Sequence, residues 1–178
     1  TQVIGGRIHA LARAHDQITD KKWQPTSVRE LIETEAEAYL GLKASRVRIE
    51  GEDVFVSPQA FGTLSLVIHE LMTNSAKYGA LCDTNGSLRI ALSLKSDGGL
   101  VIDWKEIGGP PITSQPTRTG FGTTIIERSI PYELGGKASL RYEMSGVEAR
   151  FVVPEDYVSL PNGRQVSHKK SPLPEQQA

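Results

Sequence analysis

The chain has 178 residues, of which 38% are hydrophobic and 23% are charged, and its formal net charge is −1. This size suits one globular domain with further segments, and a nearly neutral charge without a basic block argues against a nucleic-acid partner. The one cysteine, Cys82, excludes an internal disulfide and argues against a cysteine-ligated zinc site.

No apolar run in the sequence is long enough to cross a bilayer, and the first residues lack the pattern of a signal peptide. These observations predict a cytoplasmic setting, with no membrane segment in this chain. Since the sequence begins at Thr1 rather than at an initiator methionine, we expect it to be a piece of a longer protein.

Two helices are predicted at the start of the chain. Apolar residues at helical spacing from Ile4 onward favour a first helix that ends near 19–22. Thr26 or Ser27 would cap a second helix, which Gly41 would end.

A short hairpin and a long helix are predicted next. Apolar residues alternate on either side of 51–53, which is the pattern of two strands joined by a turn. Ser57 and Pro58 suit the cap and first position of a helix that would run through Tyr78.

The second half of the chain is predicted to be mostly strands. Its expected elements are strands at 87–95 and 100–105, a loop at 108–120, a helix at 123–134, and strands at 137–143 and 148–153. From 159 to 178 apolar residues become scarce, so this segment is predicted to be a linker or a disordered tail. The order of elements predicts an α+β fold: a two-layer α/β sandwich with helices on one face of a mixed, mostly antiparallel sheet.

The segment 69–81 of the predicted long helix carries the most specific chemistry. Glu70, Asn74 and Lys77 are four and three residues apart, so they lie within an arc of about 60° on one helix face. The apolar residues of the helix fall on the other side: Leu64, Ile68, Leu71 and Met72. A carboxylate, an amide and an ammonium in one row suit a magnesium–nucleotide site, although the same row also fits a solvated surface helix.

A second cluster lies where the strand near 100–105 ends. A carboxylate at this place, in the run from Asp103 to Glu106, can accept a hydrogen bond from an exocyclic amine such as that of adenine. Gly108 and Gly109 would let the backbone approach a flat ligand. The alternative is a charged strand end with an ordinary turn, with Trp104 packed in the core.

A third cluster opens the helix predicted at 123–134. Gly120, Gly122 and Thr123 are small, and small residues at a helix N-terminus expose backbone N–H groups that favour a phosphate. Such a glycine pair is weak evidence alone, because most are turns. Three clusters in this order, with a Pro/Thr-rich loop between the last two, indicate a nucleotide site more strongly than any one of them.

From 7 to 154 the chain resembles the catalytic ATP-binding domain of sensor histidine kinases, in the Bergerat (GHKL) superfamily that also holds gyrase, Hsp90 and MutL ATPases. Within it the chain is similar to the HWE kinases, which are marked by a histidine in the first motif and Trp-x-Glu in the second. Both marks are present, as His69 and as Trp104-Lys105-Glu106. The resemblance implies the Bergerat fold, with ATP and Mg²⁺ as cofactors.

The resemblance also implies roles for the residues of the first two clusters. Asn74 would ligate the Mg²⁺ that bridges the phosphates, and Glu70 would polarise the attacking imidazole. Lys77, counted with Glu70 as catalytic, would contact phosphate or ribose together with Tyr78. Glu106 would bind the adenine amine.

The remaining roles follow from the same resemblance. Gly108 and Gly109 would admit the base, the third cluster would flank the phosphates, and 110–119 would form a short lid. His69 is grouped with the ATP-binding residues, as a hydrogen-bonding helper near Glu70.

The resemblance implies three parts: 1–22 as the end of the second dimerisation and phosphotransfer helix, 23–158 as the catalytic domain, and 159–178 as the tail. The His-Arg-x-x-Asn setting of the phosphoacceptor is absent from this sequence. The acceptor is therefore expected upstream, and His9 and His15 are interpreted as ordinary helix residues, although Asp16 follows His15 as an acid follows many acceptors.

The function implied is transfer of the ATP γ-phosphoryl group to a histidine on an upstream helix, followed by relay to an aspartate of a response-regulator receiver domain. The expected partners are the upstream sensor and phosphoacceptor helices and the receiver, with a homodimer possible for the full-length protein. An ATP-sensing pseudokinase that regulates a partner without phosphotransfer is the main alternative. A serine kinase that acts on an anti-sigma antagonist is disfavoured by the Trp-x-Glu motif. A DNA-repair or topoisomerase-type ATPase is disfavoured by the absence of a basic segment.

Overall fold

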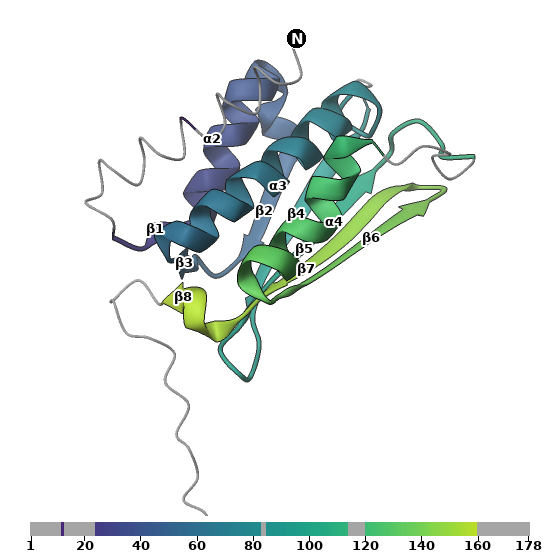
Figure 1. Ribbon diagram of the computed structural model, residues 1–178. Helices are drawn as coiled ribbons and strands as arrows, with labels where there is room; N and C mark the ends of the chain where they lie inside the picture. Colours follow the sequence, from purple (N-terminus) through teal and green to yellow (C-terminus); the bar gives the residue numbers. More distant parts are fainter. Residues whose placement is uncertain (1–11, 13–23, 83–84, 114–119, 160–178) are drawn as a thin grey trace, which may run out of the picture.

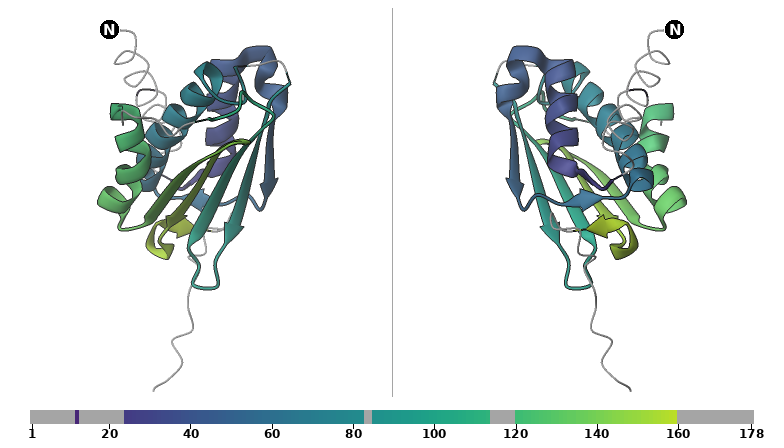
Figure 2. Two further views of the ribbon diagram at one scale, coloured as in Figure 1. Left: turned by 90° about the vertical axis from the view of Figure 1, so that its right-hand side faces the viewer. Right: turned by 90° about the vertical axis from the view of Figure 1, so that its left-hand side faces the viewer.

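A computed structural model describes residues 12, 24–82, 85–113 and 120–159. In these residues one five-stranded sheet is covered on one face by three helices (Figures 1 and 2). Across the sheet the strands are β2 (Val47–Gly51), β4 (Ser87–Leu94), β5 (Leu100–Ile107), β7 (Gly146–Val153) and β6 (Lys137–Glu143). The predicted α+β fold, a two-layer sandwich with a mixed sheet, is confirmed.

The two predicted serine caps begin the helices α2 (Val28–Leu40) and α3 (Pro58–Lys77). The Ser27 hydroxyl accepts a hydrogen bond from the N–H of Glu30, and the Ser57 hydroxyl accepts one from Ala60. Each bond satisfies an N–H group that has no partner within its own helix. Gly41 follows α2 at φ 51°, a backbone conformation that suits glycine, and leads into the 3₁₀ helix η1 (Gly41–Arg46).

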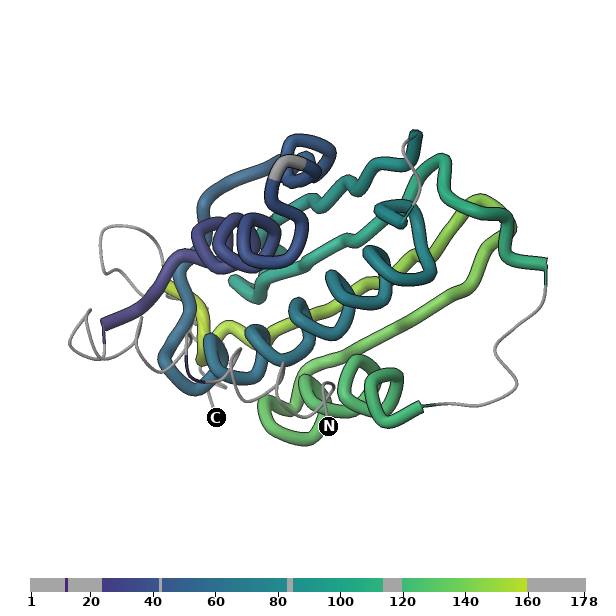
Figure 3. Tube along the Cα trace, turned by 90° about the horizontal axis from the view of Figure 1, so that it is seen from above, coloured from purple at the N-terminus to yellow at the C-terminus, as the bar shows by residue number. Residues whose placement is uncertain are grey.

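The third helix, α4 (Phe121–Leu134), begins two residues before the predicted start at 123. Gly120 is its N-cap and supplies no side-chain bond, so the small-residue cluster forms the cap and first turn of the helix. Figure 3 shows α3 running between α2 and α4, which makes α3 the central helix of its layer.

The hairpin predicted around 51–53 is wrong, although both of its strands exist. β2 pairs in parallel with β4, and Gly51, the expected turn residue, is itself paired with Leu92. The guanidinium of Arg29 donates to the carbonyls of Ile49 and Gly51, at 3.1 and 2.8 Å. Alternation in a sequence therefore identified strands correctly here, but it carries no information on which strand is the neighbour.

The second strand of that expected hairpin belongs to a separate small sheet. β3 (Phe55–Val56) lies between β1 (Thr26–Ser27) and β8 (Val158–Ser159) and is antiparallel to both. The short 3₁₀ helix η2 (Glu155–Tyr157) precedes β8. This sheet ties the start of the described domain to its end.

The two later hairpins are confirmed as antiparallel pairs, β4 with β5 and β6 with β7. β5 continues to Ile107, two residues beyond its predicted end, and so includes Glu106. Every second residue of β5 from Leu100 to Glu106 is buried, because this side of the strand faces the helices. Glu106 therefore points into the helix-covered side of the sheet, in line with Trp104.

The core lies between the sheet and the three helices. Its largest side chains include Trp104, Phe61 and Phe151, and the apolar side of α3 is buried as predicted. The predicted first helix and the predicted tail lie outside the described residues, apart from Ala12, which is helical. Among the described residues no helix combines the length and apolar character needed to cross a membrane.

Candidate functional site

Three segments that are distant in the sequence meet at one end of the sheet: the end of α3, the end of β5 and the β6–β7 turn. The N-terminus of α4 lies toward the same end of the molecule (Figures 1 and 3). The N–H groups of Ala80, just after α3, and of Val147, at the start of β7, both donate to Glu106 Oε2, at 3.2 and 3.4 Å. The N–H of Ile112 donates to the carbonyl of Met144 at 3.3 Å, which holds the loop after β5 against the β6–β7 turn.

The polar row predicted on α3 runs from the protein interior to solvent. Glu70 is 5% exposed, Asn74 is half-buried and Lys77 is exposed. A solvated surface helix would not bury the first of these groups, so that interpretation does not account for Glu70. The row ends beside Tyr78, which is 76% exposed and whose N–H donates to the Asn74 carbonyl at 2.8 Å.

Glu106 is a buried carboxylate in a slot made of backbone. It is 3% exposed, and its two backbone donors come from opposite sides, one after α3 and one from β7. A β-carbon at Gly79 would lie 2.4 and 2.5 Å from the two carboxylate oxygens, and one at Gly146 would lie 2.9 Å from Glu106 Cβ. Only glycine leaves room for the carboxylate as it is placed.

The glycines after β5 serve the packing of the loop. Gly108 has φ 72°, and a β-carbon at Gly109 would lie 2.5 Å from the Ala80 α-carbon. The loop therefore passes directly against the segment that donates to Glu106. The predicted access for a flat base through these glycines stays a prediction.

Arg46 holds the other side of the same segment. Its guanidinium donates to the carbonyls of Leu81 and Gly86, at 3.0 and 2.9 Å. Sequence reasoning missed Arg46, Gly79, Gly146 and Ala80, because their partners lie dozens of residues away in the chain. Gly79 lies inside the segment 69–81, which the sequence marks as the most specific one, and this position is the signal that could have identified it.

The N-terminus of α4 carries Gly120, Gly122 and Thr123, as predicted for a phosphate site. Among the described residues, nothing lies within 4 Å of a β-carbon built at Gly120. Gly122 and Thr123 are half-buried in the first turn, and Phe121 is 68% exposed. Of the predicted lid, 114–119 lies outside the described residues.

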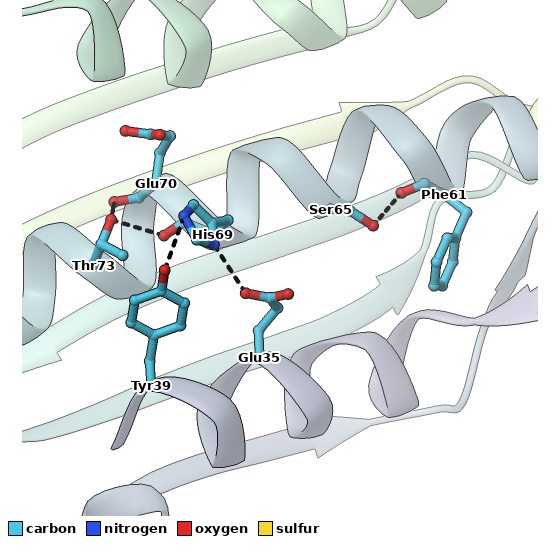
Figure 4. Close-up of polar contacts among 7 residues, drawn as sticks. All are labelled: Glu35, Tyr39, Phe61, Ser65, His69, Glu70 and Thr73. Carbon is cyan, nitrogen blue, oxygen red and sulfur yellow. Dashed lines mark hydrogen bonds and ion pairs between the residues drawn. The ribbon is translucent and has the colours of Figure 1, made fainter. Parts of the chain in front are cut away.

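The buried ring of His69 is directed at α2 (Figure 4). Its Nδ1 lies 3.1 Å from Glu35 Oε2, and its Nε2 lies 3.3 Å from the Tyr39 hydroxyl. The Tyr39 ring meets the imidazole edge-on, with the centroids 4.8 Å apart. Figure 4 shows the Glu70 side chain on the other side of α3, so the described contacts of His69 are with α2 rather than with Glu70.

Ion pairs occupy the open face of the sheet, away from these groups. Lys105 and Arg141 approach Glu148 to 2.8 and 2.9 Å, and Arg150 lies 3.2 Å from Asp103. The hydrogen bond from Lys105, together with Arg141, holds the pKa of Glu148 below its ordinary value. These carboxylates are therefore paired with cations of neighbouring strands, whereas Glu106 accepts from backbone N–H groups.

Comparison with known proteins agrees with this arrangement. The HWE histidine kinase family profile matches residues 1–53. The blue-light-activated histidine kinases of Brucella anthropi and Brucella ovis are each 30% identical over 156 residues, which is 86% of this chain and 32% of each relative. The chain thus spans about a third of the length of these relatives.

Solved structures show the same fold. The histidine kinase domain of the Erythrobacter litoralis EL346 blue-light-activated histidine kinase superimposes with a TM-score of 0.67 at 15% identity, covering 84% of this chain and 73% of that one. The catalytic domain of the histidine kinase ThkA gives a TM-score of 0.55 at 23% identity, covering 74% and 95%. By its motifs, its match to the HWE histidine kinase family over residues 1–53 and these relatives, the chain is similar to the HWE histidine kinases, and its fold is that of histidine kinase catalytic domains.

Proposed function

We propose that this domain binds ATP with Mg²⁺ and transfers the γ-phosphoryl group to a histidine that lies outside the described residues. The observation that carries the proposal is the buried Glu106 carboxylate, which backbone groups hold at the end of α3 next to the row of Glu70, Asn74 and Lys77. A nucleotide with its base at Glu106 and its phosphates toward α4 would use every part of this arrangement.

Glu106 is the group we assign to the adenine. The N–H groups of Ala80 and Val147 both donate to Oε2, and in the described part of the chain Oε1 can accept the hydrogen bond of an exocyclic amine. A carboxylate accepts and does not donate, so this position favours adenine over guanine, which carries a carbonyl at the equivalent place. Gly108 and Gly109 would line the path of the base.

Asn74 is the residue we assign to Mg²⁺. The described residues contain no cluster of three or more His, Cys, Asp and Glu side chains that could enclose a metal. A single half-buried amide oxygen instead fits a magnesium ion that takes most of its ligands from phosphate and water. Such an ion would neutralise phosphate charge during transfer.

Phosphate contacts are assigned to Lys77, to Tyr78 and to the first turn of α4. The exposed ammonium of Lys77 and the helix N-terminus with the small residues Gly120, Gly122 and Thr123 both favour an anion. His69, which the sequence groups with the ATP-binding residues, is assigned no direct contact with ATP, because the described contacts of its ring are with α2.

Glu70 is assigned to the acceptor imidazole. One ring nitrogen would attack the γ-phosphorus as the bond to the β,γ-bridging oxygen breaks, with ADP leaving. Glu70 would accept the hydrogen bond of the other ring nitrogen and so stabilise the positive charge that develops on the ring. Burial of Glu70 strengthens such an interaction, because water screens it less.

The wider assignments rest on the relatives, which are about three times as long as this chain. We assign 1–22 to the end of a dimerisation helix, 23–158 to the catalytic domain and 159–178 to a linker. The phosphohistidine would pass its phosphoryl group to the aspartate of a receiver domain, in the cytoplasm, where ATP is available. His15 is not assigned as the acceptor.

The test is to incubate the full-length protein with ATP labelled in the γ-phosphate. Acid-labile, base-stable label on the protein is the result expected for a phosphohistidine. ATP binding without transfer to the protein would instead identify an ATP-sensing pseudokinase. No binding of ATP at all would contradict both functions.

A further inference from the structure

We infer that Glu35 and Tyr39 of α2 are positioning residues, which act through His69 to hold the Glu70 carboxylate in place for phosphoryl transfer. This inference rests on the role proposed above for Glu70. It assigns a purpose to three polar side chains that the proposed ATP site does not use.

The three side chains form one hydrogen-bonded chain across the α2–α3 interface (Figure 4). Glu35 and His69 are each 2% exposed, and Tyr39, at 36%, closes the chain at the surface. Because a carboxylate only accepts, Nδ1–H of His69 donates to Glu35, and in the neutral ring Nε2 accepts from the Tyr39 hydroxyl. Both ring nitrogens are thereby fixed, which leaves the imidazole one orientation.

The orientation of His69 is transmitted to Glu70 through the backbone of α3. Adjacent side chains project from a helix at angles about 100° apart. When hydrogen bonds hold one side chain in place, they therefore also fix the direction in which the next one projects. The hydroxyl of Thr73 donates to the carbonyls of both His69 and Glu70, at 2.9 and 3.1 Å, which stiffens this turn. A small rotation of α3 about its axis would therefore move the Glu70 carboxylate sideways.

The packing of α2 against α3 does not need these polar groups. The apolar side chains of α2 that already join the core are Val28, Leu31, Ile32, Ala36 and Leu40. Burial of a carboxylate and an imidazole is unfavourable unless both are well partnered, and an apolar pair would hold two helices together at least as well. Hydrogen bonds add a fixed side-chain orientation, and a catalytic side chain on the next residue requires a fixed orientation.

The test uses the full-length kinase with its acceptor histidine, and measures the single-turnover rate of phosphoryl transfer at saturating ATP and Mg²⁺. Glu35→Leu and Tyr39→Phe each remove one bond to His69. We expect each to slow transfer about tenfold while the ATP dissociation constant changes less than about twofold. Glu35→Gln, whose amide oxygen can still accept from Nδ1–H, should retain a rate within about threefold of the wild type.

Two controls separate positioning from a loss of structure. Glu37→Leu changes an exposed glutamate of the same helix and should leave both the rate and the dissociation constant unchanged. Tyr39→Phe removes a single oxygen atom, so it keeps the test decisive even if Glu35→Leu does not fold.

A double-mutant cycle with Glu70→Gln gives the deciding result. If Glu35 and Tyr39 act through Glu70, their substitution should add little further loss once Glu70 is already changed. Equal slowing in both backgrounds, or no slowing in either, would overturn the inference. A Glu70→Gln variant that transfers at the wild-type rate would instead contradict the proposed role of Glu70 itself.

Discussion

At the scale of single residues, the site depends on how one carboxylate is accommodated. Glu106 is buried and accepts hydrogen bonds from two backbone N–H groups. Its side chain also fills the space that β-carbons at Gly79 and Gly146 would take. Its place is therefore set by main chain from two separate segments, 79–80 and 146–147, and main chain moves less than side chains do. Two consequences can be measured.

Replacement of Glu106 by Ala should weaken ATP binding by about 10- to 100-fold, because a hydrogen bond to a charged group is lost. The preference for ATP over GTP should disappear at the same time, since the group that distinguishes the two bases is gone. Calorimetric titration with each nucleotide measures both effects. Asp103→Ala is the matched control, because this carboxylate of the same strand pairs with Arg150 and should leave both affinities as in the wild type.

Gly79→Ala tests the slot itself. The added β-carbon would lie 2.4 Å from a Glu106 oxygen, so the carboxylate must shift, and ATP affinity should fall at least about tenfold. Gly62→Ala is the control, because a β-carbon there meets none of the described residues within 4 Å. In that helical position the change should raise the free energy of unfolding by about 0.5–1 kcal/mol and leave ATP binding unaltered. Equal ATP affinity in Gly79→Ala and Gly62→Ala would show that ATP binding does not depend on the space left by Gly79.

At the scale of elements, the sequence predicted α2, α3 and α4 well because the signals of these helices are local. Ser27 and Ser57 bond within three residues of themselves, and the apolar spacing of α3 is contained in the helix itself. The pairing of β2 with β4 was not predictable in this way, because alternation defines the two faces of a strand and not its neighbour. The same limit applies to the site: Glu106 was predicted from its own motif, whereas its donor Val147 is 41 positions away.

The segment between α3 and β4 owes its place to one side chain from another element. Arg46→Met removes both hydrogen bonds from η1 to the carbonyls of Leu81 and Gly86 while keeping much of the apolar stem. We expect the dissociation constant for ATP to rise about 3- to 10-fold, because Ala80, one of the donors to Glu106, loses its support. Hydrogen–deuterium exchange should show faster exchange at 79–82. Arg46→Lys can keep one of the two hydrogen bonds, so its dissociation constant and its exchange rate should lie between those of the wild type and of Arg46→Met. Unchanged exchange in Arg46→Met would contradict the proposed role of Arg46.

At the scale of the whole molecule, one end of the sandwich carries the proposed site and the other is closed by the small sheet of β1, β3 and β8. The N-terminal side of the domain enters through β1 and continues directly into α2. Since α2 contacts the central helix through Glu35 and Tyr39, the element nearest the chain's entry also touches the helix that carries Glu70. The architecture thus offers a short physical connection between upstream segments and the site.

The proposed site depends most on Asn74, because this residue joins the metal, the phosphates and the polar row of α3 in one assignment. The direct measurement is calorimetric titration of this domain with ATP, with and without Mg²⁺, for the wild type and for Asn74→Ala. We expect Mg²⁺ to strengthen ATP binding to the wild type, and Asn74→Ala to abolish this Mg²⁺-dependent binding while the thermal unfolding curve stays the same. If Asn74→Ala binds ATP with Mg²⁺ as tightly as the wild type, the assigned site is contradicted.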